Sequence, residues 1–243
     1  MSTTLRASLI ASTAALLASG AHGAVVTSWN FNTAATSADI GTGETSAVET
    51  NVRTVSLSKK NQRKGATQVT NRVLEVLNFD AQLSRSGSDG ISFATDTNDF
   101  QDLSVSFLQL NGARSSAWAQ FQYSIDGGVS FITTGLVNDG KYRVAASKSF
   151  KLVSFDLSGI TEANNIADFQ FRVMAIHAPD MDKFVATSGK RYAATGATAT
   201  WKFDELAVSG STLAPTNVVP APGAIALLMA AGTIATAARR RNP

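Results

Sequence analysis

The sequence predicts an all-β protein whose central part is an antiparallel β-sandwich. Apolar residues in that part recur at every second position, as they do on the buried face of a strand. No long stretch between residues 24 and 214 shows the three-and-four spacing of an amphipathic helix. The loops between the alternating segments are rich in Gly, Asn, Asp and Ser, which is typical of turns between antiparallel strands.

The clearest alternating segment is 119–125, in which polar residues separate the apolar ones. The same period of two occurs in 103–107, 153–157 and 169–173. Further strands are expected at 25–32, 52–58, 68–79, 90–95 and 198–209. Strands of this kind direct one row of side chains to a core and the other row to solvent.

The last expected strand changes register part-way along. Trp201 and Phe203 fall on one face, whereas Leu206 and Val208 fall on the other. One extra residue near Asp204–Glu205 would return both pairs to the same face, so we predict a β-bulge there. The alternative is a strand that is buried on both faces.

The N-terminal segment has the parts of a secretory signal peptide. A charge at Arg6 precedes the uncharged run 7–20, and Ala21-His22-Gly23 offers small residues at a cleavage site. We therefore expect 1–23 to be a signal peptide, handled by the secretion machinery and signal peptidase. A buried N-terminal helix is the alternative. The sandwich is expected at 24–214 and a separate tail at 215–243.

The basic character of the chain comes from its ends. Four of its 21 Lys and Arg residues lie there (Arg6, Arg239, Arg240 and Arg241), and all 18 Asp and Glu residues lie in the middle, which is left with a charge of about −1. This balance argues against a nucleic-acid partner. The chain has no cysteine, which excludes thiol catalysis, iron–sulfur clusters and cysteine-ligated zinc.

Two tryptophans are candidates for ligand stacking. Trp118 and Trp201 could each pack on a sugar ring if they are exposed, although the alternation around Trp201 favours a core position. The basic run 59–64 is expected to be a solvated hairpin loop, with a site for an acidic polysaccharide or phosphate as the alternative.

Acidic residues offer weak candidates for a structural Ca²⁺, and no other cofactor is expected. Asp96, Asp99 and Asp102 cluster between two expected strands, but their spacing lacks the glycine and terminal glutamate of an EF-hand. Asp204, at the expected bulge, is a further candidate. A loop without metal is the simpler interpretation of both.

His177 ends an alternating segment and is interpreted as a hydrogen-bonded residue at the end of a strand. The alternatives are a metal site with Asp180 and Asp182, or part of a Ser-His-Asp arrangement. No Gly-x-Ser-x-Gly motif supports the second alternative. No catalytic residue is therefore assigned.

The segment 124–131, Ser-Ile-Asp-Gly-Gly-Val-Ser-Phe, predicts a tight hairpin because Gly127 and Gly128 tolerate positive φ angles. It resembles the Asp-box hairpin of sialidase-type propellers, with Ser130 and Phe131 in place of the usual Thr and Trp. The resemblance implies that Asp126 stabilises the turn and has no catalytic role. A single copy argues against a propeller.

The tail combines three features. Val219, Pro220, Ala221 and Pro222 precede the uncharged run 224–238, which would span about 22 Å as a helix. Arg239, Arg240 and Arg241 follow it and would hold the C-terminus in the cytoplasm. This order resembles the PEP-CTERM sorting signal, with Ala221 where the typical motif has glutamate. The resemblance implies a transiently anchored substrate of an exosortase-type membrane enzyme.

The middle resembles uncharacterised domains that often precede such tails. Its matching segments are 29–31, 113–128 and 200–206, and they imply a jelly-roll-like sandwich without known activity. We expect a non-catalytic protein of the cell surface or extracellular matrix. The alternatives are a carbohydrate-binding module of extracellular polysaccharide and a secreted hydrolase.

Overall fold

The computed structural model describes residues 23–57 and 71–214. By internal contacts the chain divides into Met1–Thr212 and Leu213–Pro243, and the fold below is that of the first unit. The expected signal peptide, the basic run 59–64 and the sorting tail lie outside the described residues, apart from Gly23. Within the described ranges, no helix has the length and apolar character needed to cross a membrane.

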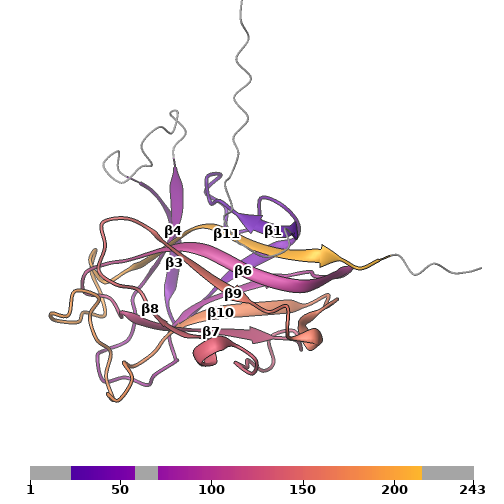
Figure 1. The fold of residues 1–243 in the computed structure, drawn as a ribbon. Coiled ribbons are helices and arrows are strands. Elements are labelled where there is room, and N and C mark those ends of the chain that lie inside the picture. Colours follow the sequence, from indigo (N-terminus) through magenta and orange to yellow (C-terminus); the bar gives the residue numbers. More distant parts are fainter. Residues whose placement is uncertain (1–22, 58–70, 215–243) are drawn as a thin grey trace, which may run out of the picture. The chain divides into compact units, whose positions relative to one another are not determined.

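Antiparallel strands of the described residues form two sheets (Figure 1). The first sheet has the order β3-β4-β11-β6-β9, and β1 also pairs with β11. Its strands are β1 (Ala24–Trp29), β3 (Asn51–Ser56), β4 (Arg72–Leu77), β6 (Phe100–Asn111), β9 (Lys151–Asp156) and β11 (Trp201–Thr212).

The second sheet has the order β2-β5-β10-β7-β8. Its strands are β2 (Gly43–Val48), β5 (Gly90–Thr95), β7 (Trp118–Ser124), β8 (Lys141–Arg143) and β10 (Phe169–Ala175). Two short 3-10 helices, η2 (Val137–Gly140) and η3 (Thr161–Ala163), lie in loops. The prediction of an all-β, antiparallel protein is therefore confirmed for the described residues.

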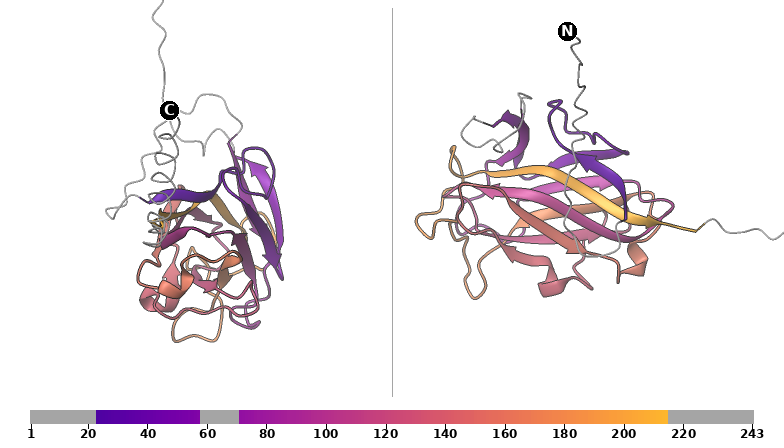
Figure 2. Two further views of the ribbon diagram at one scale, coloured as in Figure 1. Left: turned by 90° about the vertical axis from the view of Figure 1, so that its right-hand side faces the viewer. Right: turned by 45° about the horizontal axis from the view of Figure 1, so that its top comes forward.

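The two sheets pack face to face through aromatic side chains. Phe121 of β7 stacks on Phe155 of β9 with ring centroids 4.1 Å apart, and Phe93 of β5 meets the edge of Phe203 of β11 at 6.5 Å. Both contacts join one sheet to the other, as expected for a sandwich. The views in Figure 2 show the same two layers from other directions.

The predicted bulge in β11 is confirmed. Its register with β6 shifts between Asp204 and Ala207, and Glu205 has a φ of 45°. Trp201, Phe203, Leu206 and Val208 are consequently all fully buried. The bulge also divides β11 between two partners, because the part before it pairs with β4 and the part after it pairs with β1.

Most expected strands are present with small changes at their ends. The strand at 90–95 matches β5, and 52–58 and 68–79 correspond to β3 and β4. Two strands were not predicted, namely β2 and β8. Both lie at the edges of the second sheet, where one side of the strand has no neighbour to impose an apolar pattern.

Candidate functional site

The outer face of β7 and β10 carries a compact set of large polar side chains. Inward-facing Phe121, Phe169 and Phe171 are fully buried, so the residues between them point away from the core. These outward residues form the glutamine–arginine face, defined as Gln120, Gln122, Gln170 and Arg172. All four side chains are half-buried.

Hydrogen bonds link three members of this face in one direction. The Nε of Arg172 donates to Oε1 of Gln122 at 2.6 Å, and Nε2 of Gln122 donates to Oε1 of Gln120 at 2.9 Å. Nε2 of Gln120 then donates to the carbonyl oxygen of Asp139 at 2.9 Å. Because each bond fixes the orientation of the next amide, the remaining donors and acceptors of these side chains have defined directions.

The guanidinium of Arg172 is held from two sides. Its carbon lies 3.9 Å from the ring centroid of Phe131, and Arg172 faces Gln122 across the strands. Partial burial lowers the pKa of Arg172 below its ordinary value. Among the described residues, no hydrogen-bond acceptor is placed on its two terminal nitrogens. Those nitrogens can therefore donate hydrogen bonds to an acceptor outside the protein.

Trp118 lies at one end of this face. It precedes the inward-facing Ala119, so its indole is on the outer side of the sheet, and it is partly exposed. Across the strands, Arg143 of β8 pairs with Trp118 and Lys141 pairs with Gln120. Trp118 and Phe131 thus place an aromatic ring at either end of the polar chain.

The hairpin after β7 supports the opposite corner of the face. Oδ1 of Asp126 accepts hydrogen bonds from the Ser124 hydroxyl at 2.7 Å and from the backbone N–H of Ser130 at 3.0 Å. The serine hydroxyls and the Ser130 amide lower the pKa of Asp126 to about 2. Gln170 donates from Nε2 to the Gly127 carbonyl oxygen at 2.9 Å. Asp126 therefore has the structural role that was expected of it, and the hairpin also orients Gln170.

The expectation that Trp201 could stack on a ligand is corrected. Its side chain is fully buried, tilts against Phe79 at 4.8 Å and donates from Nε1 to the Ser116 carbonyl oxygen at 3.0 Å. Inward alternation with Phe203 places it in the core. Of the two stacking candidates, Trp118 alone has exposed surface.

The acidic candidates for Ca²⁺ are not brought together. Asp96 caps the backbone of Asn98 at 2.8 Å, and the backbone N–H groups of Asp99 and Asp102 donate to Asn165 and Asn164. Asp204 lies on β11, where its Oδ1 accepts from the backbone of Glu205. Within the described residues, no three His, Cys, Asp or Glu residues are grouped to hold a metal ion.

His177 has the role of a residue at the end of a strand. Its Nε2 lies 2.8 Å from the Ser84 carbonyl oxygen, and its ring meets the edge of Phe184 at 4.8 Å. Its backbone N–H donates to the Ser86 hydroxyl. These contacts tie the segment 81–86 to the end of β10, so the predicted hydrogen-bonded role is confirmed.

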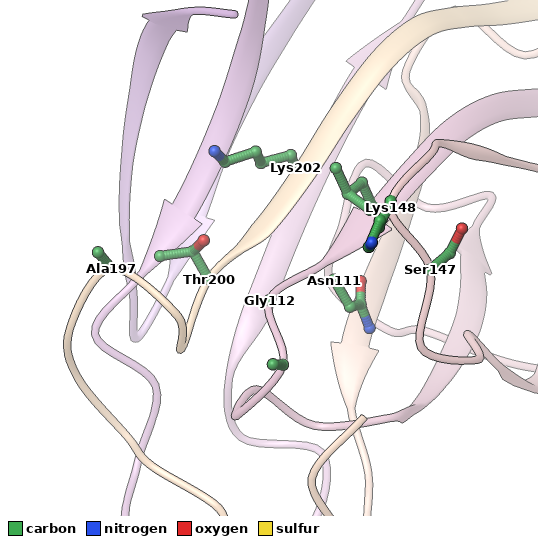
Figure 3. Close-up of a pocket in the computed structure, with 9 residues that line it drawn as sticks. Asn111, Gly112, Ser147, Lys148, Ala197, Thr200 and Lys202 are labelled. Atoms are coloured by element: carbon green, nitrogen blue, oxygen red, sulfur yellow. The ribbon is translucent and has the colours of Figure 1, made fainter. Parts of the chain in front are cut away.

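A recess lies where β6 ends and β11 begins (Figure 3). We call it the junction pocket, and its volume is about 360 Å³. It is lined by Leu110, Asn111, Gly112, Ala113, Ser147, Lys148, Ala197, Thr200 and Lys202. Lys148 and Lys202 make the lining basic.

Comparison with known proteins assigns no family to the chain. No family model and no curated protein matches the chain. Among solved structures, the N-terminal CBM22-1–CBM22-2 tandem domain of Xyn10C from Paenibacillus barcinonensis has 12% identity and a TM-score of 0.44. That match covers 84% of this chain and 50% of the other.

Two further matches have similar strength. The CBM22-1–GH10 modules of Clostridium thermocellum endo-1,4-β-D-xylanase 10B, complexed with xylohexaose, have 13% identity and a TM-score of 0.40. TmCBM61 in complex with β-1,4-galactotriose has the same two values. The xylanase match covers 81% of this chain and 29% of the xylanase modules. The TmCBM61 match covers 75% of this chain and 94% of TmCBM61. The chain thus spans half or less of the first two proteins, and all three TM-scores are below 0.5.

Proposed function

We propose that the domain is an exported, non-catalytic carbohydrate-binding module that holds a glycan on the glutamine–arginine face. The observation that carries the proposal is the chain of oriented side chains from Arg172 through Gln122 to Gln120. Aromatic rings at both ends of this chain, Trp118 and Phe131, complete the set.

Sugar chemistry suits this arrangement. A pyranose presents neighbouring hydroxyls, each of which can donate and accept, and planar amide and guanidinium groups offer paired hydrogen bonds at matching spacing. The apolar face of the ring packs on an aromatic side chain such as Trp118. A few convergent polar groups beside an aromatic surface are the usual composition of a small-molecule site.

The position of these residues on strands supports binding rather than turnover. Both β7 and β10 have neighbours on each side in the second sheet, so their backbones are fixed. The face therefore loses little conformational freedom when a ligand binds. Its side chains are amides, a guanidinium and aromatic rings, none of which supplies the paired carboxylates of a glycosidase.

The two ends of the chain would deliver the domain to the cell surface. Residues 1–23 would direct a jelly-roll-like domain to the secretion machinery and signal peptidase. The tail, with its motif at 219–222, its hydrophobic helix and its arginines, would hold the protein in the membrane until an exosortase-type enzyme acts. The domain would then remain at the cell surface or in the matrix, bound to extracellular polysaccharide. Both parts rest on the sequence patterns described above.

The test is a glycan array with the full chain and two variants. Arg172→Met removes the guanidinium and keeps an unbranched stem, and we expect binding to weaken about 10-fold to 100-fold because a hydrogen bond to a charged group is lost. Arg85→Met, an exposed arginine in the loop before β5, is the matched control and should bind like the parent.

Three results would overturn the proposal. They are the absence of any glycan signal, equal binding by the parent and Arg172→Met, and the release of reducing ends from a bound polysaccharide. The last would identify a hydrolase. Circular dichroism of each variant checks that loss of binding is not loss of folding.

A further inference from the structure

We propose that the junction pocket is a second binding site, separate from the glutamine–arginine face, and that it takes a single sugar residue bearing a carboxylate. This inference goes beyond the proposed function, because the pocket is built on the other sheet and can be tested by itself. Its volume of about 360 Å³ is at the lower end for ligand pockets, which suits one sugar residue better than an extended chain.

The base of the pocket is a pair of cross-strand neighbours. Leu110 of β6 lies opposite Lys202 of β11 on the outer side of the first sheet. Leu110 provides an apolar surface for the carbon skeleton of a sugar, and the stem of Lys202 extends that surface. The ammonium of Lys202 lies 3.4 Å from the Glu75 carboxylate on β4, and in Figure 3 the side chain extends away from Asn111.

Two loops form a wall that is already in place without a ligand. The backbone N–H of Gly112 donates to the Thr200 carbonyl oxygen at 2.7 Å, and that of Arg114 donates to Thr198 at 2.8 Å. A Cβ at position 112 would lie 2.4 Å from the Thr198 carbonyl oxygen, so glycine is needed for this close approach.

A buried polar network fixes the inner side of the pocket. Asn111 is 4% exposed, accepts from Nε2 of Gln109 at 2.9 Å and donates to the Ser116 carbonyl oxygen at 2.9 Å. Gln109 in turn accepts from the Tyr142 hydroxyl at 2.7 Å. The carboxamide of Asn111 is therefore held in one orientation where it lines the pocket.

Charge identifies the class of ligand. The three stretches that supply most of the lining, 110–118, 144–151 and 190–202, contain no Asp or Glu. Their basic residues are Arg114, Lys148, Lys151, Lys190, Arg191 and Lys202. This excess is local, since the middle of the chain is close to neutral, and it favours an anion at the pocket.

Lys148 is the residue that would meet the anion. Among the described residues, no carboxylate lies within ion-pair distance of the Lys148 ammonium. Lys202, by contrast, forms an ion pair with Glu75, which also pairs with Arg53 at 2.7 Å. In Figure 3 the ammonium of Lys148 points to the side of the pocket where Asn111 lies. A carboxylate on Lys148 and a hydroxyl on Asn111 would orient a uronate. The lining contains no aromatic ring for stacking a nucleobase.

The test is titration calorimetry of the full chain with trigalacturonate and with the uncharged galactose trimer. We expect trigalacturonate to bind more tightly than the neutral trimer, and Lys148→Met to weaken its binding about tenfold. Lys183→Met, another exposed lysine, should leave that binding unchanged. Ala197→Trp should abolish it by filling the pocket from an exposed position in its lining.

The outcomes separate this site from the glutamine–arginine face. If Arg172→Met leaves trigalacturonate binding intact and Lys148→Met weakens it, the pocket is a second site whatever the fate of the proposed function. Unchanged binding in both Lys148→Met and Ala197→Trp would overturn the inference. Equal binding of polyglutamate or single-stranded DNA, lost in the same variants, would also overturn it by showing a general polyanion surface.

Discussion

β7 and β10 carry buried aromatic side chains on their inner face and hydrogen-bonded polar side chains on their outer face. On the inner face, Phe121, Phe169 and Phe171 are fully buried and pack against aromatic residues of both sheets. On the outer face, half-buried amides and one guanidinium bond to one another and leave groups open to solvent.

The difference predicts that stability and the proposed glycan binding can be changed separately in these strands. Apolar burial on the inner face contributes in proportion to the area removed from water. Hydrogen bonds on the outer face exchange for bonds to water, so their net contribution to folding is small. The same bonds set the orientation of the side chains that the proposed glycan would meet.

The largest effect is expected at Phe171. Its ring lies 5.1 Å from Phe93 and 5.7 Å from Phe121, and Phe171→Ala leaves a cavity between these neighbours. We expect the free energy of unfolding to fall by about 3–5 kcal/mol. Urea denaturation measures the loss, and Phe171→Leu should cost clearly less. A loss below about 1 kcal/mol in the alanine variant would contradict the assigned inner face.

A smaller effect is expected in the hairpin at Gly128. Its φ is +87°, and a Cβ there would lie 2.5 Å from Oε1 of Gln170. Gly128→Ala should therefore lower stability by about 1–2 kcal/mol and displace Gln170. Gly87→Ala is the matched control, because its φ is +78° but nothing lies within 4 Å. Equal losses in the two variants would show that the contact with Gln170 contributes nothing.

Gln122 links Arg172 to Gln120 on the outer face. Gln122→Ala should change the free energy of unfolding by less than about 1 kcal/mol, because water replaces the lost partners on a half-exposed face. Binding of whichever glycan the array identifies should still weaken about tenfold. Thermal melts and titrations on one preparation measure both quantities. A large loss of stability with unchanged binding would reverse the roles assigned to the two faces.

The smallest effect is expected from acid at Asp126. Hydrogen bonds lower its folded-state pKa to about 2, below the ordinary value of 3.8. Its contribution to stability is therefore present above pH 3.8 and is lost as pH falls through about 2. The thermal midpoints of the parent and Asp126→Asn should converge over that interval. A difference that stays constant from pH 5 to pH 2 would count against the hydrogen bonds of the hairpin.

The sequence predicted the fold better than the site, for a physical reason. Alternation reports burial, so it located β5, β7 and β10 and also placed the bulge at Glu205. It missed β2, whose sequence Gly-Glu-Thr-Ser-Ala-Val has no apolar row. An edge strand of this kind is held by backbone pairing to one neighbour, which leaves little trace in side chains.

The glutamine–arginine face was visible in part and was overlooked. The polar residues of 119–125 are Gln120, Gln122 and Ser124, and those of 169–173 are Gln170 and Arg172, whereas those of 103–107 are serines. Long amide and guanidinium groups on adjacent strands are the signal that could have indicated recognition. Which strands are adjacent does not follow from alternation, since β7 and β10 pair across about fifty residues of sequence. Alternation favoured a core position for Trp201, but it could not name the partners Phe79 and Ser116, which come from distant segments.

The division of β11 at Glu205 has a consequence for the order of assembly. β11 lies at the centre of the first sheet, pairs with β1, β4 and β6, and is the last strand of the described residues. β1, the first strand, pairs with no other strand of the sheet. The first sheet therefore cannot form completely until residues 201–212 have been synthesised, even though its other strands are synthesised earlier. Folding depends on contacts between the two ends of the domain, which favours slow and all-or-none assembly.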